Sequence, residues 1–190
     1  MYTLSMNDEK ILEARNQVLK LLSGKLDDFY LAGGTALSLF YFQHRESYDL
    51  DFFAREFSRE NARSVMKLVS GQAGYGSELI GEESRRGFAA MMVYALQIDK
   101  ESALKIDFVQ DFYPLMEPLK EINGIKVLSI SDIYFRKILA TCGTIPAVSD
   151  SGRMIFVGGR QEAKDFFDLY FLSKTFMPLS WVVMGIPWFP

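Results

Sequence analysis

The sequence has few residues that could form cross-links or bind a soft metal ion: its 190 residues include one cysteine, Cys142, and one histidine, His44. A single cysteine excludes an internal disulfide and any zinc site built from several thiolates. This usage is typical of a reducing compartment, so we expect a cytoplasmic protein. The chain also lacks an excess of positive charge, because its formal net charge is −3. Binding of a polynucleotide would therefore need a local basic patch.

Long hydrophobic runs are missing as well. Residues 1–10 have no basic start followed by an apolar centre, so no signal peptide is visible. The most apolar tract, residues 177–190, contains three prolines and is shorter than the roughly 20 residues that span a bilayer. We therefore expect no membrane partner, and a C-terminal tail that packs through Trp181 and Trp188 on the protein or on a partner.

The composition is that of an ordinary globular protein, with 49% hydrophobic and 24% charged residues. Hydrophobic periodicity predicts helices and strands along the whole chain. The expected helices cover residues 8–22, 35–44, 58–70, 131–141 and 162–176; the expected strands cover 29–32, 48–53, 78–83, 88–98, 103–110 and 122–130. Residues 143–159 are expected to form an irregular connection. This order predicts an α/β (α+β) fold with a mixed sheet flanked by helices in residues 1–129 and a helical part in residues 130–190 packed on that core.

A glycine turn follows the first expected strand. Gly33 and Gly34 would let backbone amides approach a phosphate without a side chain in the way. The Thr35 hydroxyl could donate one more hydrogen bond. A purely structural turn is an equally good interpretation of the two glycines alone.

Two carboxylates alternate with apolar residues in the strand expected over residues 48–53. Asp49 and Asp51 are two residues apart, so their side chains would project from one face with Cα atoms roughly 6–7 Å apart. The simpler interpretation is the solvated face of an edge strand. The apolar flanks instead favour acids beside a covered core, where they repel each other unless a cation neutralises them. A shared divalent ion would satisfy this arrangement.

A lysine and an aspartate near the C-terminus form a second candidate site. Lys137 lies among apolar residues of its expected helix, so its ammonium group must meet an acid or a phosphate. Asp165 and Asp168 share one face of the last expected helix. An ion pair between Lys137 and Asp165, a contact with a triphosphate, or both, would fit this pattern.

Basic residues recur every four positions after the acidic strand, at Arg55, Arg59, Arg63 and Lys67. Such a stripe is usually a solvated helix face, and the alternative is a track for a polynucleotide backbone.

These motifs together resemble the AbiEii/AbiGii-type toxin family of the DNA polymerase β nucleotidyltransferase superfamily. The residues that carry the resemblance are Gly33-Gly34-Thr35, His44-Arg45, Ser47, Asp49-Leu50-Asp51-Phe52-Phe53, Asp132-Ile133, Lys137 and Lys164 to Tyr170. The resemblance implies a minimal nucleotidyltransferase fold in which the glycine turn holds a nucleoside triphosphate and acidic residues bind Mg²⁺. It also implies transfer of a nucleotide to an acceptor, in some members the 3′ end of transfer RNA, and neutralisation by an antitoxin protein.

The superfamily takes a third carboxylate from a neighbouring strand, and Asp107 is the best candidate here. An Asp107 on a wet face beside Lys105 is the structural alternative. The sequence therefore predicts a magnesium-dependent nucleotidyltransferase that uses Asp49, Asp51 and Asp107, with Gly33, Gly34, Thr35, Lys137 and Asp165 as nucleotide-binding residues. The alternative is a non-catalytic module that keeps the fold to bind a nucleotide or a partner.

Overall fold

The structure, a computed structural model, describes residues 5–85, 88–160 and 162–185. The chain divides into two compact units, Met1–Ser129 and Ile130–Pro190, called here the first and second units. None of the helices in the described ranges is both long enough and apolar enough to span a membrane.

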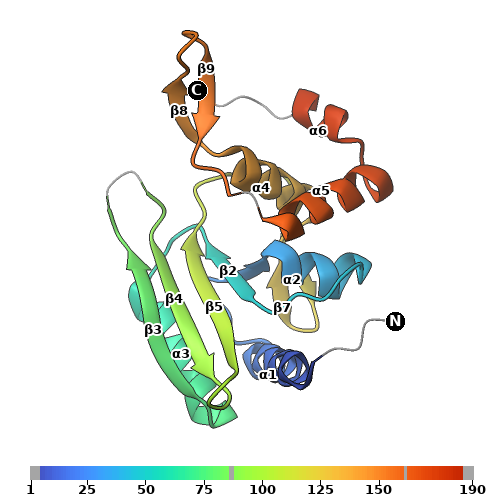
Figure 1. The fold of residues 1–190 in the computed structure, drawn as a ribbon. Helices are drawn as coiled ribbons and strands as arrows, with labels where there is room; N and C mark the ends of the chain where they lie inside the picture. The colour runs from blue at the N-terminus through green and yellow to red at the C-terminus, as the bar shows by residue number, and fades with distance from the viewer. Residues whose placement is uncertain (1–4, 86–87, 161, 186–190) are drawn as a thin grey trace. The chain divides into compact units, whose positions relative to one another are not determined.

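The described part of the first unit is built on a seven-stranded mixed sheet (Figure 1). The strands lie in the order β3 (Gly76–Glu83), β4 (Met91–Gln97), β5 (Ala103–Gln110), β2 (Leu50–Ala54), β1 (Tyr30–Ala32), β7 (Ile125–Val127) and β6 (Lys120–Ile122). The pairs β2–β5 and β1–β7 are parallel, and the others are antiparallel. The predicted mixed sheet flanked by helices is confirmed.

Two amphipathic helices, α1 (Met6–Leu22) and α3 (Arg59–Ala73), pack against each other, α1 on β5 and α3 on β3 and β4 (Figure 1). Each begins at a serine, Ser5 or Ser58, whose side chain accepts a hydrogen bond from the backbone of the first turn. Their apolar stripes and the alternate residues of the central strands form a core whose members include Val18, Leu22, Met66, Val69, Leu50, Phe52, Met92, Leu104 and Phe108.

The helix predicted over residues 35–44 begins earlier and is not uniform. Helix α2 (Gly33–Leu37) starts directly after β1 and continues as a π-helical turn, η1 (Ser38–Phe42). The segment ends at Gln43, which takes a left-handed conformation with φ of 51°. The loop 43–49 then leads back to β2.

The prediction of one strand over residues 122–130 is wrong. Strands β6 and β7 form a hairpin whose two-residue turn is Asn123-Gly124. Both turn residues have positive φ, 53° and 72°, the geometry that favours the Asn-Gly pair in tight hairpins. An Asn-Gly pair is a strong hairpin signal, and it outweighs the apolar pattern that favoured one strand.

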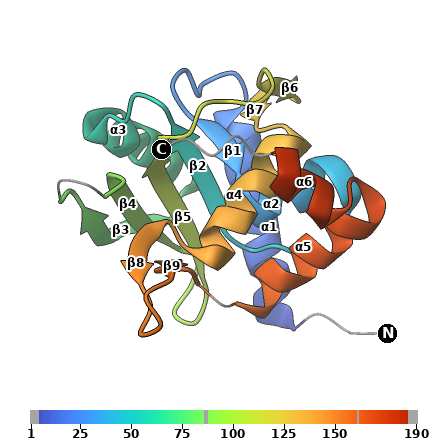
Figure 2. The same cartoon turned by 90° about the horizontal axis from the view of Figure 1, so that it is seen from above.

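The second unit contains the helices α4 (Ile130–Cys142), α5 (Ala163–Thr175) and α6 (Leu179–Gly185), with α4 and α5 side by side (Figure 2). The irregular connection predicted over residues 143–159 is wrong, because β8 (Ile145–Val148) pairs with β9 (Met154–Val157) as a hairpin. Trp181, one of the two tryptophans expected to pack on the protein or on a partner, is 65% exposed in this chain, so packing on a partner stays a prediction. Trp188 lies outside the described residues.

Candidate active site

Acidic residues meet on the central strands β2 and β5. Asp51 is the register partner of Asp107 across this parallel pair, and neighbouring strands lie about 4.8 Å apart. Asp49 directly precedes β2. Alternation places Asp49 and Asp51 on the face opposite Leu50, whose side chain is fully buried. The spacing expected for the first two acids is therefore present, and β5 adds Asp107 beside the second.

A lysine supplies a positive charge to this acidic face. The Lys105 Nζ lies 2.5 Å from Oδ2 of Asp107, two residues further along β5. Asp107 itself is buried, with 8% of its surface exposed. The alternative of an Asp107 beside Lys105 thus describes the pairing correctly, but the carboxylate is not on a wet face. Lys105 therefore neutralises part of the negative charge of the acidic site, a role that the sequence predicted for a metal ion.

The acidic site provides a small set of oxygen ligands for a magnesium ion. In the described ranges, no three His, Cys, Asp or Glu side chains form a group that could hold a metal ion. Asp51 and Asp107 remain as a pair of oxygen donors on adjacent strands. Proteins commonly bind Mg²⁺ through one or two carboxylates, and substrate phosphates and water complete the octahedron. The Asp51–Asp107 pair fits that mode of binding.

The glycine turn is packed against charged side chains of the same unit. A Cβ atom added to Gly33, whose φ is 69°, would lie 2.0 Å from Oδ2 of Asp51. A Cβ added to Gly34 would lie 2.4 Å from Nη2 of Arg45 and 3.1 Å from Oγ of Ser47. A side chain at Gly33 would combine a strained backbone with a clash against Asp51, whereas a side chain at Gly34 would displace the mobile end of Arg45. Arg45 is one of the residues that carry the family resemblance, but the sequence alone indicates no role for its side chain.

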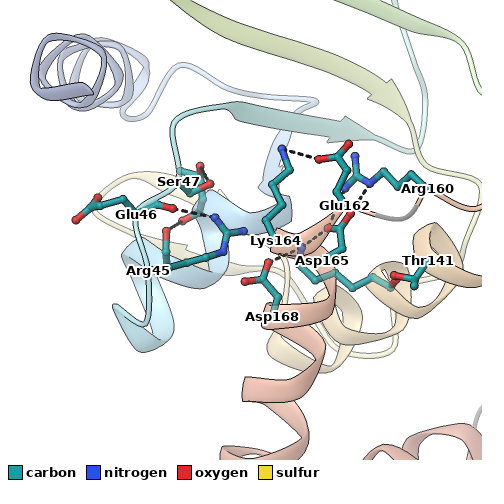
Figure 3. Close-up of polar contacts among 12 residues, drawn as sticks. Arg45, Glu46, Ser47, Thr141, Arg160, Glu162, Lys164, Asp165 and Asp168 are labelled. Atoms are coloured by element: carbon teal, nitrogen blue, oxygen red, sulfur yellow. Dashed lines mark hydrogen bonds and ion pairs between the residues drawn. The ribbon is translucent and has the colours of Figure 1, made fainter. Parts of the chain in front are cut away.

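The loop that carries Arg45 is fixed by buried hydrogen bonds to Ser47 and Asp49. Arg45, Glu46 and Ser47 lie together in this loop (Figure 3). Thr35 is fully buried, and its hydroxyl bonds Oγ of Ser47 at 2.8 Å and the backbone carbonyl of Asp49. The guanidinium of Arg15, from α1, donates to the Ser47 carbonyl. Burial lowers the pKa of Arg15. Thr35 was expected to donate a hydrogen bond to a phosphate. In the structure its hydroxyl donates to the Asp49 carbonyl, directly before β2.

The second unit contains an ionic cluster in which Lys137, Asp165 and Asp168 are buried and Arg160 is exposed (Figure 3). The Lys137 Nζ lies 2.9 Å from Oδ1 of Asp165 and 2.6 Å from Oδ2 of Asp168, and both carboxylates are fully buried. Arg160 adds a bond from Nε to Asp165 at 2.7 Å. Burial alone would raise the pKa of Asp165, but hydrogen bonds and charges from Lys137 and Arg160 outweigh it and lower the pKa below its ordinary value. The structure contains the ion-pair arrangement; a nucleotide contact of Lys137 stays a prediction.

The basic stripe does not form one continuous track. Arg55 lies beyond the end of β2 rather than on α3, and it donates to the Tyr113 carbonyl. Arg59 and Arg63 both approach Glu82 of β3, with shortest N–O distances of 2.6 and 3.9 Å. Part of the positive charge is therefore neutralised within the first unit, which weakens the expectation of a polynucleotide track.

Comparison with known proteins identifies the family. The family model described as "Nucleotidyl transferase AbiEii toxin, Type IV TA system" matches residues 18–181. The chain belongs to this AbiEii family. An uncharacterized protein of Aquifex aeolicus (strain VF5) is 31% identical over 169 residues, which cover 85% of this chain and 66% of that protein. This chain therefore spans just under two thirds of the length of that curated relative.

Solved structures share the AbiEii chain's fold. A Helicobacter pylori protein assigned as a nucleotidyltransferase is similar with a TM-score of 0.58 and 24% identity, over 91% of this chain and 71% of that one. JHP933 from Helicobacter pylori is similar with a TM-score of 0.55 and 27% identity, over 92% of this chain and 69% of that one. MenT4, a nucleotidyltransferase toxin of Mycobacterium tuberculosis H37Rv, is similar with a TM-score of 0.56 and 17% identity, over 94% of this chain and 63% of that one. The predicted nucleotidyltransferase fold is confirmed.

Proposed function

We propose that this AbiEii chain transfers a nucleotide from a nucleoside triphosphate to an acceptor, with Mg²⁺ held at Asp51 and Asp107. The observation that carries the proposal is the register pairing of these two acids directly beside the Gly33 turn. Family membership supports the same reaction class. The carboxylates supply oxygen ligands, and the glycine turn places its backbone directly beside Asp51.

The residues of the site divide the work of such a transfer. A bound magnesium ion would neutralise charge on the attacking and leaving oxygens. Asp51 and Asp107 would hold it, and Asp49 would add a ligand or take the proton of the acceptor hydroxyl. Gly33 and Gly34 would line the phosphate chain. Thr35 keeps the Asp49 backbone in place through its buried hydrogen bond, so we assign it a positioning role.

Lys137 and Asp165 stabilise the second unit through their ion pair. They also stay candidates for nucleotide binding. The Lys137 ammonium is enclosed by two buried carboxylates, which favours a structural contribution to the second unit. For Lys137 to contact a triphosphate, its ammonium group would have to bind a phosphate oxygen in addition to these carboxylates.

The acceptor and the protein partner follow from the family. AbiEii toxins belong to type IV toxin–antitoxin systems, so we propose an antitoxin protein as partner. RNA is the acceptor proposed, because the attacking group of nucleotide transfer is a hydroxyl and RNA carries one at its 3′ end.

A non-catalytic nucleotide-binding module is the second candidate. The observation that favours it is the Lys105–Asp107 ion pair, which provides a cation for the acidic site without a metal ion. Such a module would bind nucleoside triphosphate equally well with magnesium and with a chelator, and it would transfer nothing.

The test is incubation of the protein with each of the four α-labelled nucleoside triphosphates and total RNA, with magnesium or with a chelator. We expect label in RNA for at least one triphosphate, only with magnesium. Triphosphate binding that is independent of magnesium and gives no labelled product would overturn the transferase proposal in favour of the binding module.

A further inference from the structure

A guanidinium group lies directly on the glycine turn. The position that a Cβ of Gly34 would occupy is 2.4 Å from Nη2 and 3.4 Å from Cζ of Arg45. Contacts this short mean that the Arg45 head fills the space that a side chain would take. Arg45 comes from the loop 43–49, between η1 and β2, and is only partly exposed.

The loop holds this guanidinium in place. Arg45 donates from Nη1 to the Glu46 carbonyl at 2.8 Å. The next residue, Ser47, is fixed by the buried Arg15 and by Thr35. The loop is thereby tied to the turn directly after Arg45, which limits the rotamer entropy that the arginine loses when a ligand binds.

Opposite charges flank the glycine turn. The Asp51 carboxylate packs on Gly33, and the Arg45 guanidinium packs on Gly34. A phosphate chain that follows this backbone would run from the acidic, metal-binding side toward the arginine. Guanidinium groups bind phosphate oxygens with paired, charge-assisted hydrogen bonds.

We propose that Arg45 binds the terminal phosphates of the donor and thereby selects nucleoside triphosphates over monophosphates. This inference rests on the proposed function, because it assigns a residue to the donor site. Arg45 is then the group that recognises the part of the donor that leaves as pyrophosphate.

The first test compares Arg45→Gln and Arg45→Lys with wild type in calorimetric binding of inorganic tripolyphosphate, a nucleoside triphosphate and the matching monophosphate, all with magnesium. Arg45→Gln should weaken binding of the two triphosphate-containing ligands by about tenfold to a hundredfold, while monophosphate binding changes less than about threefold. Arg45→Lys should lie between. Arg55→Gln, which removes the same charge beyond the far end of β2, should bind like wild type.

The second test uses Gly34→Ala, whose added methyl group would displace the Arg45 guanidinium. Gly34→Ala alone should weaken tripolyphosphate binding, whereas in the Arg45→Gln background it should add little, because the group it displaces is gone. Additive effects of the two changes would overturn the inference.

The outcomes separate this inference from the proposed function. If wild type transfers nucleotides but Arg45→Gln keeps the wild-type preference for triphosphate over monophosphate, the role of Arg45 is refuted and the transferase proposal stands. An equal loss of triphosphate and monophosphate binding would make Arg45 a structural support of the loop and would also refute the inference. A wild type that binds neither tripolyphosphate nor any nucleoside triphosphate would refute both.

Discussion

Asp51 and Asp107 are register partners on the parallel strands β2 and β5. These strands are far apart in the sequence, and α3, β3 and β4 lie between them along the chain. The pairing puts two carboxylates side by side on one face of the sheet, beside Gly33. Such a pair is unfavourable without a nearby cation, and Lys105 supplies a positive charge at Asp107.

The first prediction concerns Lys105. Lys105→Gln should lower the free energy of unfolding without magnesium by about 1 kcal/mol, because Asp107 loses an ion pair. The effect is modest because the Lys105 side chain is partly exposed. Magnesium should then raise the melting temperature more in this variant than in wild type. Lys67→Gln, which removes an exposed charge on α3, should change neither value. A smaller magnesium response in Lys105→Gln would show that Lys105 assists metal binding.

The second prediction separates strain from collision at the glycine turn. Gly24 and Gly33 both have φ of 69°, but only Gly33 has a neighbour, Asp51, in the space of a Cβ. Gly24→Ala should therefore cost about 1 kcal/mol from backbone strain alone. Gly33→Ala should cost more and should reduce the magnesium-induced rise in melting temperature, since Asp51 must move. Equal costs in chemical denaturation would mean that the Asp51 contact is unimportant.

The third prediction concerns the ionic cluster of the second unit. Lys137→Met should destabilise the protein by about 3–5 kcal/mol, because two fully buried carboxylates lose the ammonium group that pairs with both of them. Lys174→Met, at an exposed position on α5, should cost less than about 0.5 kcal/mol. Urea unfolding measures both. A Lys137→Met protein as stable as wild type would remove the structural role of the cluster and favour a ligand contact.

The fourth prediction is the acid response of Asp165. Its pKa is lowered in the folded protein relative to the ordinary value of 3.8, so its contribution to stability is complete above roughly pH 4 to 5 and is lost as the pH falls below that value. Arg160→Gln removes one source of the lowered pKa. The free energy of unfolding of this variant should therefore depend less on pH between 5 and 3 than that of wild type. An identical pH profile would contradict the assigned pair.

Sequence patterns predicted those elements whose burial alternates. The bounds of β5 were predicted as residues 103–110 and are Ala103–Gln110, because one side of the strand faces the core. The hairpin β8–β9 was missed because apolar residues stand on both of its faces, so no two-residue period marks it. Neither face of the hairpin is buried, since the neighbouring residues Ile155 and Phe156 are 40% and 41% exposed.

The candidate site could be predicted only in part for a related reason. Motif spacing identified Asp49, Asp51 and the glycines, which are local features. Asp107 and its neighbour Lys105 were also predicted, from the superfamily pattern and from alternation along their strand. The register pairing of Asp107 with Asp51, and the contact of Arg15 from α1 with Ser47, depend on the fold. Thr35 was expected to face a ligand, yet its hydroxyl is buried against Ser47. A linear pattern cannot tell which partner satisfies a hydroxyl group.

The most direct test of the account is the rate of nucleotide transfer by Asp51→Asn, measured with magnesium beside wild type and Asp27→Asn, which changes an exposed acid. Asp51→Asn should lose about a hundredfold or more in rate while its melting temperature without metal stays equal to wild type or rises, because repulsion from Asp107 is relieved. Asp27→Asn should behave like wild type. Transfer by Asp51→Asn at the wild-type rate would contradict the assignment of the Asp51–Asp107 pair as the active site.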